Sequence, residues 1–238
     1  MTTQPKAILF DFGGTLDYDG VDWFRRLHRA ICAAGDALEW DLFEEAGDWA
    51  ANEIGRWEDT PQCTMAQTVG RLCEQTHARL GHLHPTTPTR WDPAAIAHAF
   101  VAESEIHLNR NRDILRQMAK KFRLGCISNN WGNTAGWCSH YQFSEFFEVM
   151  VDSTLVGAMK PARIIFQTAL DQLQLPGQAC IYVGDRFDFD VAGAHAAGLV
   201  PIWITNGSYN SSVDENLQHR KIGALNELLT LDGLNPKA

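Results

Sequence analysis

The 238-residue sequence contains no Cys-x-x-Cys pair and no apolar run long enough to span a bilayer. Its cysteines are scattered, and several lie inside apolar segments: Cys32, Cys63, Cys73, Cys126, Cys138 and Cys180. This distribution favours buried free thiols over a disulfide framework or a zinc site. The N-terminal residues show no signal-peptide pattern, so we expect a cytoplasmic protein without a membrane partner.

The sequence also lacks an excess of positive charge. It has 29 acidic residues against 20 lysines and arginines, a formal net charge of −9. A surface of this sign repels phosphate backbones, which disfavours a nucleic-acid partner. The apolar fraction of 45% and the charged fraction of 21% are typical of a globular protein. The length allows one large domain or a core with an insertion, and it leaves the oligomeric state open.

An apolar strand that ends in an acid lies close to the N-terminus. The segment 8–17 reads ILFDFGGTLD, so the apolar run ends at Asp11 and two glycines follow at once. This pattern indicates a sharp turn where the carboxylate emerges. Ligands bind at the carboxyl ends of strands in open α/β sheets, so Asp11 is a candidate site residue. An aspartate that only caps a turn is the alternative.

The rest of the chain divides into a helical stretch and an alternating stretch. From 19 to 107, apolar residues recur at helical spacing and strand signals fade. Beyond Arg112, strand patterns at 124–127, 146–151, 180–183 and 201–204 alternate with helix patterns at 113–122, 161–173, 190–197 and 224–229. The alternation predicts an α/β fold with a parallel sheet. We expect residues 1–18 and 108–238 to form the core and 19–107 to form an inserted helical unit.

Polar residues end three of the predicted strands. Asp11, Ser128 and Asp185 follow apolar runs, and Lys160 lies between the last two. Each residue alone can be explained as a cap or a turn. Because the carboxyl ends of parallel strands share one edge of a sheet, the combination favours a site.

On these motifs the sequence resembles the haloacid dehalogenase-like (HAD) hydrolase superfamily. The matching motifs are DFGGTL at 11–16, Ser128 after an apolar strand, Lys160-Pro161, and GDRFDFD at 184–190. The match spans nearly the whole chain, with the insertion where members with a C1-type cap carry it. The resemblance implies a Rossmann-like core, a mobile cap, and phosphoryl transfer from a small phosphorylated substrate through an aspartyl-phosphate.

The resemblance also implies roles for single residues. Asp11 is the expected nucleophile, and Lys160 is expected to stabilise negative charge in the transition state. Mg²⁺ is the expected cofactor, with Asp11, the Gly13 carbonyl and Asp185 as ligands. Asp190 is expected in the metal shell, where it orients a ligand or a bound water, and it also suits the N-cap of the helix that follows.

Phosphoryl oxygens need hydrogen-bond donors. We expect Ser128, Asn129 and Gly14 to bind the substrate's phosphoryl group through their side chains or amides. Ser128 and Asn129 come directly after the predicted strand 124–127, and Gly14 lies in the loop after Asp11.

The sequence departs from the family pattern at Gly13. Most phosphatases of the superfamily have there an aspartate that protonates the leaving group, and glycine has no titratable group. Other acids and histidines are candidates to supply this proton, namely Asp17, Asp19, Asp22, Glu53, His82, His84 and Asp188. Each also has a plain surface or structural explanation.

Two alternatives to a phosphatase stay open. True 2-haloacid dehalogenases also lack the acid at the position of Gly13, but they dispense with Mg²⁺ and do not keep the fourth motif. A scaffold that has lost turnover and acts in binding is the other alternative, and five tryptophans in the insertion give it an aromatic surface or core. A phosphonate hydrolase is disfavoured, because the insertion contains no lysine for a Schiff base.

Overall fold

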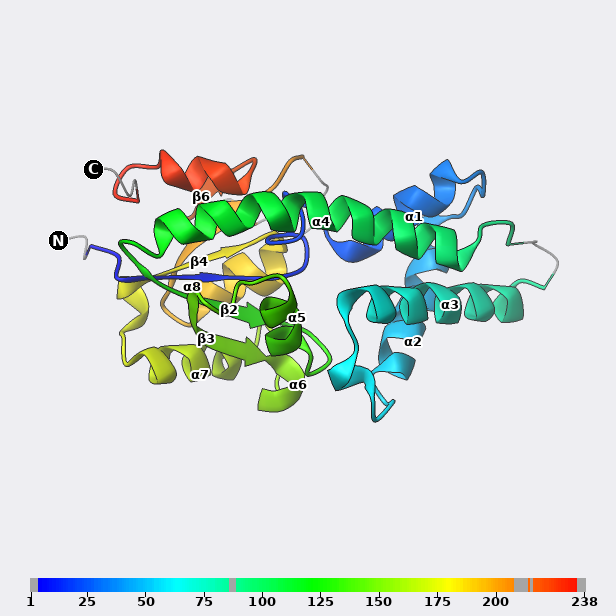
Figure 1. Ribbon diagram of the computed structural model, residues 1–238, viewed down its shortest axis with the longest axis horizontal. Helices are drawn as coiled ribbons and strands as arrows, with labels where there is room; N and C mark the ends of the chain where they lie inside the picture. Colours follow the sequence, from blue (N-terminus) through cyan, green and yellow to red (C-terminus); the bar gives the residue numbers. More distant parts are fainter. Residues whose placement is uncertain (1–3, 86–88, 208–213, 215, 235–238) are drawn as a thin grey trace. The chain divides into compact units, whose positions relative to one another are not determined.

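The computed structural model in Figure 1 describes residues 4–85, 89–207, 214 and 216–234. The chain divides into two compact units, one of Met1–Asp22 with His107–Ala238 and one of Trp23–Ile106. The first unit contains the sheet, and the second is helical. The second unit lies inside the range 19–107, for which a role as a cap stays a prediction.

The first unit is built on a six-stranded parallel sheet, which confirms the α/β, Rossmann-like fold class. The strands are β1 (Ala7–Phe10), β2 (Arg123–Ser128), β3 (Phe147–Asp152), β4 (Cys180–Gly184), β5 (Val200–Ile204) and β6 (Arg220–Ile222). Their order is β3-β2-β1-β4-β5-β6, and every neighbouring pair is parallel. The edge strand β6 was not expected, because its sequence RKI has no apolar run.

Strand β1 occupies the centre of the sheet because all four of its residues are apolar. Each has an exposed fraction of 0%, as expected for a strand with neighbours on both sides and covered faces. β1 pairs with β2 on one side and with β4 on the other. The ladder continues one residue further, where the Asp11 amide donates to the Val183 carbonyl at 2.9 Å. The sheet therefore holds Asp11 at its carboxyl edge.

Helices of the first unit alternate with the strands. They are α5 (Thr134–His140), α6 (Ser153–Val156), α7 (Arg163–Leu173) and α8 (Ala192–Ala196), with short turns η2 (Gly177–Ala179), η3 (Phe187–Val191) and η4 (Leu225–Leu229). Helix α7 buries an apolar stripe at helical spacing: Ile165, Phe166, Ala169, Leu170 and Leu173. This stripe forms one hydrophobic core with residues of β1, β2, β3 and β4. The core fixes the strand ends from which the polar side chains project.

The second unit consists of α1 (Trp23–Ala33), α2 (Trp40–Ile54), η1 (Thr60–Gln62), α3 (Met65–Leu83) and the first part of α4 (Pro93–Met118). A capping box of Thr64 and Gln67 starts α3. Arg26 is buried in this unit, with its guanidinium 3.8 Å from the Phe100 ring centroid and 2.8 Å from Ser104 Oγ.

The structure corrects two helix boundaries. The sequence predicted a helix at 113–122 that is separate from the helical stretch 19–107, but α4 runs without a break from Pro93 to Met118, since residues 94–118 contain no glycine or proline. The helix predicted from Pro161 begins at Arg163, because Ala162 has a non-helical ψ of 128°. Pro161 therefore lies before the helix and not in its first turn.

Two findings bear on the composition. All six cysteines are free thiols, as expected, and all are buried except Cys32. Among the described residues, no helix combines the length and the apolar character that a membrane span needs.

Candidate active site

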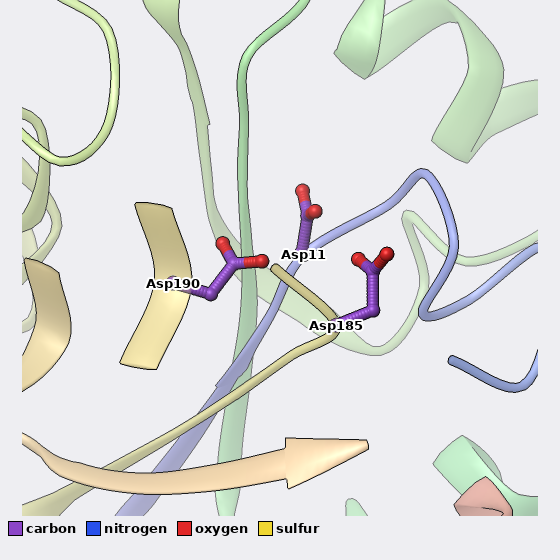
Figure 2. A group of neighbouring side chains, drawn as sticks. All are labelled: Asp11, Asp185 and Asp190. Atoms are coloured by element: carbon purple, nitrogen blue, oxygen red, sulfur yellow. The ribbon is translucent and has the colours of Figure 1, made fainter. Parts of the chain in front are cut away.

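The polar residues that follow β1, β2 and β4 meet at the carboxyl edge of the sheet. Asp11 follows β1, Ser128 ends β2 and Asp185 follows β4. All three are buried, with exposed fractions of 7%, 5% and 7%. Figure 2 shows the Asp11 side chain between those of Asp185 and Asp190. The parallel topology therefore brings together acids that are far apart in the sequence.

Lys160 lies at the centre of this group. Its ammonium is 2.7 Å from Asp11 Oδ1 and 2.7 Å from Asp190 Oδ1. It also donates to the Tyr182 hydroxyl at 3.0 Å. With an exposed fraction of 3%, Lys160 is a buried cation that bridges two carboxylates. Its location agrees with stabilisation of negative charge at Asp11.

Asp190 accepts hydrogen bonds on both carboxylate oxygens. Oδ1 accepts from Lys160 and, at 3.1 Å, from the Tyr182 hydroxyl, and Oδ2 accepts from the Arg186 amide at 2.9 Å. The π-helical turn η3 supplies this geometry, because it brings Asp190 back over the end of β4. These bonds make Asp190 a partner that positions Lys160, and its place in a metal shell stays a prediction.

Burial and like charge control protonation in the group. Burial raises the pKa of Asp11 to about 7, against the lowering effect of Lys160. Burial also raises the pKa of Asp185 well above its usual range, and the charges of Asp190 and Asp11 add to the rise. Burial alone would lower the pKa of Lys160, but the carboxylates of Asp11 and Asp190 outweigh it and raise that pKa. Lys160 is therefore an ammonium ion at neutral pH.

The donor set fits a hard divalent cation. One oxygen each of Asp11, Asp185 and Asp190 lies within 4.8 Å of the others. Carboxylate oxygens are ligands that Mg²⁺ prefers, so these residues could hold such a cation. If all three carboxylates are ionised, they exceed the one ammonium among these four groups by two negative charges, and the raised pKa values of Asp11 and Asp185 reflect burial together with that like charge. A divalent cation would neutralise that surplus.

The two glycines shape the loop after Asp11. Gly14 has a φ of +76°, and a Cβ there would lie 2.3 Å from Asp185 Oδ2, so only glycine fits between the loop and Asp185. The Gly14 amide donates to Asp17 Oδ1 at 2.6 Å, so in this structure its hydrogen bond stabilises the loop. Substrate binding by Gly14 and metal binding by the Gly13 carbonyl stay predictions.

The segment after Ser128 is tied to neighbouring loops. The Asn129 side chain bonds to the main chain of Lys160. Asp152, at the end of β3, accepts from the amides of Gly132, Thr134 and Thr154. Asp152 thus fixes the loop that follows Ser128, whose hydroxyl role stays a prediction.

Four of the candidates for a replacement acid, Asp17, Asp19, Asp188 and Glu53, have other partners in the structure. Asp17 holds Gly14, Asp19 pairs with Arg110 at 2.6 Å, and Asp188 lies 3.5 Å from Arg186. In the helical unit, Glu53 pairs with Arg56 at 2.8 Å, His82 lies in the last turn of α3, and His84 follows that helix. Asp22 is close enough to Asp185 for its charge to raise the pKa of that residue.

Sequence reasoning missed three residues that support the site: Tyr182, Asp152 and Trp203. Tyr182 lies inside the apolar run of β4, and its hydroxyl was not assigned a partner from the sequence. The Trp203 indole N–H donates to the Asp185 carbonyl at 2.8 Å. An acid at the end of a predicted strand was the available signal for Asp152, the same signal that identified Asp11.

The fold and the buried cluster define a Rossmann-like α/β protein with an acidic site at the carboxyl edge of its sheet. Residues 5–198 match the family model of haloacid dehalogenase-like hydrolases. The chain therefore belongs to this family of hydrolases, as its four motifs predicted.

Named relatives are similar to this chain in sequence, and solved structures are similar to it in fold. A glyceraldehyde 3-phosphate phosphatase of Methanopyrus kandleri is 33% identical over 228 residues, which cover 89% of this chain and 88% of the relative. A 5-amino-6-(5-phospho-D-ribitylamino)uracil phosphatase of Escherichia coli is 30% identical over 125 residues, 51% of each chain. A dehalogenase with an intermediate complex superposes with a TM-score of 0.61 at 16% identity, covering 97% of this chain and 98% of that one.

A second solved structure is YfnB of Bacillus subtilis bound to magnesium. It superposes with a TM-score of 0.56 at 17% identity, and the match covers 96% of this chain and 98% of that one. At such identities both structural likenesses establish the fold and nothing about the reaction.

Proposed function

We propose that this chain is a Mg²⁺-dependent phosphatase that hydrolyses a small phosphate ester through an aspartyl-phosphate on Asp11. The buried cluster carries the proposal, because the carboxylates of Asp11, Asp185 and Asp190 lie together beside the ammonium of Lys160. When these carboxylates are ionised, a bound cation would offset their negative charge as a phosphate group approaches. The names of the two relatives, both phosphatases, support the reaction class.

Asp11, Asp185 and the Gly13 carbonyl would hold the cation. When bound, Mg²⁺ neutralises charge on the phosphoryl oxygens and thereby makes phosphorus more electrophilic. Asp190, whose oxygens accept from Lys160 and from the Arg186 amide, would act in the metal shell, where it orients a ligand or a bound water.

The remaining steps belong to side chains of the cluster. A carboxylate oxygen of Asp11 attacks phosphorus, the ester bond to the leaving oxygen breaks, and an aspartyl-phosphate forms. Lys160 stays protonated and stabilises the negative charge that passes between Asp11 and the phosphoryl oxygens. Ser128 and the main-chain amide of Asn129 donate to the same oxygens. Water then attacks phosphorus, which releases phosphate and restores Asp11.

Gly13 limits the leaving groups that this site handles well. Positioned acid catalysis contributes about 10²–10⁴-fold to a rate, and Gly13 supplies no proton. Asp17, Asp19 and Asp188 are held in other contacts. We therefore expect aryl phosphates, whose leaving groups need little protonation, to react faster than alkyl phosphates.

An aryl phosphate with Mg²⁺ provides the direct test. We expect turnover that a chelator abolishes, and a loss of about 10³-fold or more in Asp11→Asn. Asp113→Asn is the matched control, because Asp113 is an exposed aspartate far along the chain on α4. Turnover that persists in Asp11→Asn, or that ignores the chelator, contradicts the proposal.

A panel of small phosphorylated compounds then addresses the substrate. The relatives' named substrates are phosphorylated small molecules, so glyceraldehyde 3-phosphate and other sugar and polyol phosphates form the panel. The helical unit of Trp23–Ile106 is expected to act as the cap that selects among them.

The glycine at position 13 is also the one feature that favours a 2-haloacid dehalogenase. Halide release from a short 2-haloacid in the presence of chelator would support that second candidate. A folded protein with no turnover on either set of substrates would instead support a binding scaffold. Asp185 and Asp190 argue for the phosphatase, because a dehalogenase needs no surplus of buried carboxylates.

A further inference from the structure

The side chain of Asn129 makes a two-point contact with the main chain of Lys160. Asn129 Oδ1 accepts from the Lys160 amide at 2.7 Å, and Asn129 Nδ2 donates to the Lys160 carbonyl at 3.1 Å. The two residues are 31 positions apart in the chain. We call this pair of bonds the Asn129 clamp.

The clamp depends on the chemistry of a carboxamide. Rotating the amide by 180° would set donor against donor and acceptor against acceptor, so the two partners on Lys160 fix its orientation. Aspartate has the same shape without the donor, and alanine has neither group. Asparagine is therefore suited to hold both main-chain groups of one residue.

The loop that carries Asn129 is itself anchored. The amide of Asn130 donates to Ser153 Oγ at 3.0 Å, and the Asn130 carbonyl accepts from Ser153 Oγ and from Thr154 Oγ1 at 2.7 Å. Asp152 holds the amide of Gly132 at 2.9 Å. Asn129 thus projects from a segment that is fixed by its neighbours. Its side chain can therefore hold the main chain of Lys160 in one position.

The side-chain ammonium of Lys160 has little room to move. Its ammonium lies 2.7 Å from Asp11 and from Asp190 and is 3% exposed, so a main-chain shift moves the charge inside the acid cluster. Misplacement of a reacting group by about 1 Å costs on the order of 10²-fold in rate. The two bonds of Asn129 join the main chain of Lys160 directly to the loop after Ser128, and they therefore restrict such a shift.

We propose that Asn129 is a positioning residue whose side chain acts through Lys160, and that this side chain does not bind the substrate itself. Its carboxamide sets the main chain of Lys160, and the ammonium in turn reaches Asp11 in the geometry that stabilises the transition state. The catalytic part of this inference rests on the proposed phosphatase function. The clamp itself is a property of the fold and has its own readout.

Steady-state kinetics of Asn129→Ala on an aryl phosphate with Mg²⁺ separate the two roles. We expect kcat to fall about 10-fold, with KM changed less than twofold, because the clamp does not touch substrate. Asn129→Asp keeps the acceptor and loses the donor, so we expect a loss of kcat there as well. A rise in KM with unchanged kcat would overturn the proposal in favour of direct substrate binding.

A double-mutant cycle with Lys160→Met tests whether Asn129 acts through Lys160. In that background we expect Asn129→Ala to change the residual kcat less than twofold, because the positioned ammonium is gone. An undiminished 10-fold effect would overturn the proposal, since it would show action independent of Lys160. Asn52→Ala is the control, because the Asn52 side chain bonds along its own helix, to the Asp48 carbonyl at 2.8 Å.

Amide hydrogen exchange at Lys160 tests the clamp without any turnover. We expect the Lys160 amide to exchange about 10-fold faster or more in Asn129→Ala, while amides of the buried strand β1 keep their protection. Unchanged exchange at Lys160 would overturn the clamp. If the wild-type protein hydrolyses no phosphate ester, the phosphatase proposal fails on the kinetic assay, while this measurement still decides the clamp.

Discussion

Replacing Lys160 with methionine is expected to destabilise the metal-free protein by about 3 kcal/mol, at the lower end of the range for removing one partner of a buried ion pair. Methionine fills a similar volume, so the change removes charge more than packing. The ammonium is 2.7 Å from each of Asp11 and Asp190, and its removal leaves buried carboxylates without a cation.

The lower end applies because Asp11 can take up a proton. Its pKa is about 7 even beside Lys160, and loss of the ammonium raises that pKa further. Protonation of Asp11 then relieves part of the repulsion in the variant. Asp190 keeps the Arg186 amide and the Tyr182 hydroxyl as donors, which reduces the loss in the same direction.

Chemical denaturation in EDTA, at pH 7, measures the effect. In a separate thermal unfolding experiment, a loss of about 3 kcal/mol corresponds to a shift in Tm of roughly 6 °C for a chain of this length. Saturating Mg²⁺ is expected to reduce the difference between variant and wild type, since the cation would neutralise the same carboxylates. Lys120→Met is the control, because Lys120 is exposed after α4. A loss below about 1 kcal/mol in EDTA would refute the charge argument.

Three further substitutions test the supports of the site and of the helical unit. Trp203→Phe keeps the ring but removes the indole donor to the Asp185 carbonyl, so calorimetric titration should show Mg²⁺ binding about 10-fold more weakly, and unchanged affinity would contradict this role. Gly14→Ala places a Cβ 2.3 Å from Asp185 Oδ2 at a φ of +76°, so we expect about 1–3 kcal/mol of destabilisation in thermal unfolding, and a neutral effect would contradict the packing argument. Arg26→Met removes a buried guanidinium that lies 3.8 Å from the Phe100 ring centroid, so we expect about 2 kcal/mol of destabilisation in thermal unfolding of the protein, and a neutral effect would contradict a stabilising role for this contact.

The sequence predicted the sheet well where strands are long, apolar and bounded by turn residues. β1 is the clearest case, because its apolar run ends at Asp11 and two glycines. β6 was missed because two of its three residues are charged and exposed at the sheet edge. The continuous helix α4 was predicted as separate pieces, because apolar spacing alone does not distinguish a change of the buried face from a break.

The charged residues of the buried cluster were easier to predict than the residues that support them. Asp11, Lys160, Asp185 and Asp190 lie in motifs with fixed order, and the structure brings all four together. Tyr182 lies in an apolar strand, and the strand's position in the sheet decides that its hydroxyl faces Asp190. Contacts of this kind depend on topology, which local sequence patterns do not specify.

The structure also changes the question that Gly13 raises. Asp17 and Asp19 are the acids closest to Gly13 on its C-terminal side, but the first holds the Gly14 amide and the second pairs with Arg110. Giving either one a proton-transfer role would break a contact that shapes the loop after Asp11. We therefore expect Asp17 and Asp19 to supply no proton, and we expect a leaving group of low basicity to react without one. The slope of log(kcat/KM) against leaving-group pKa measures the requirement for a proton, because kcat/KM reports the step in which the leaving group departs and the aspartyl-phosphate forms. A steep negative slope is expected here, and a slope near zero would mean that another acid protonates the leaving group.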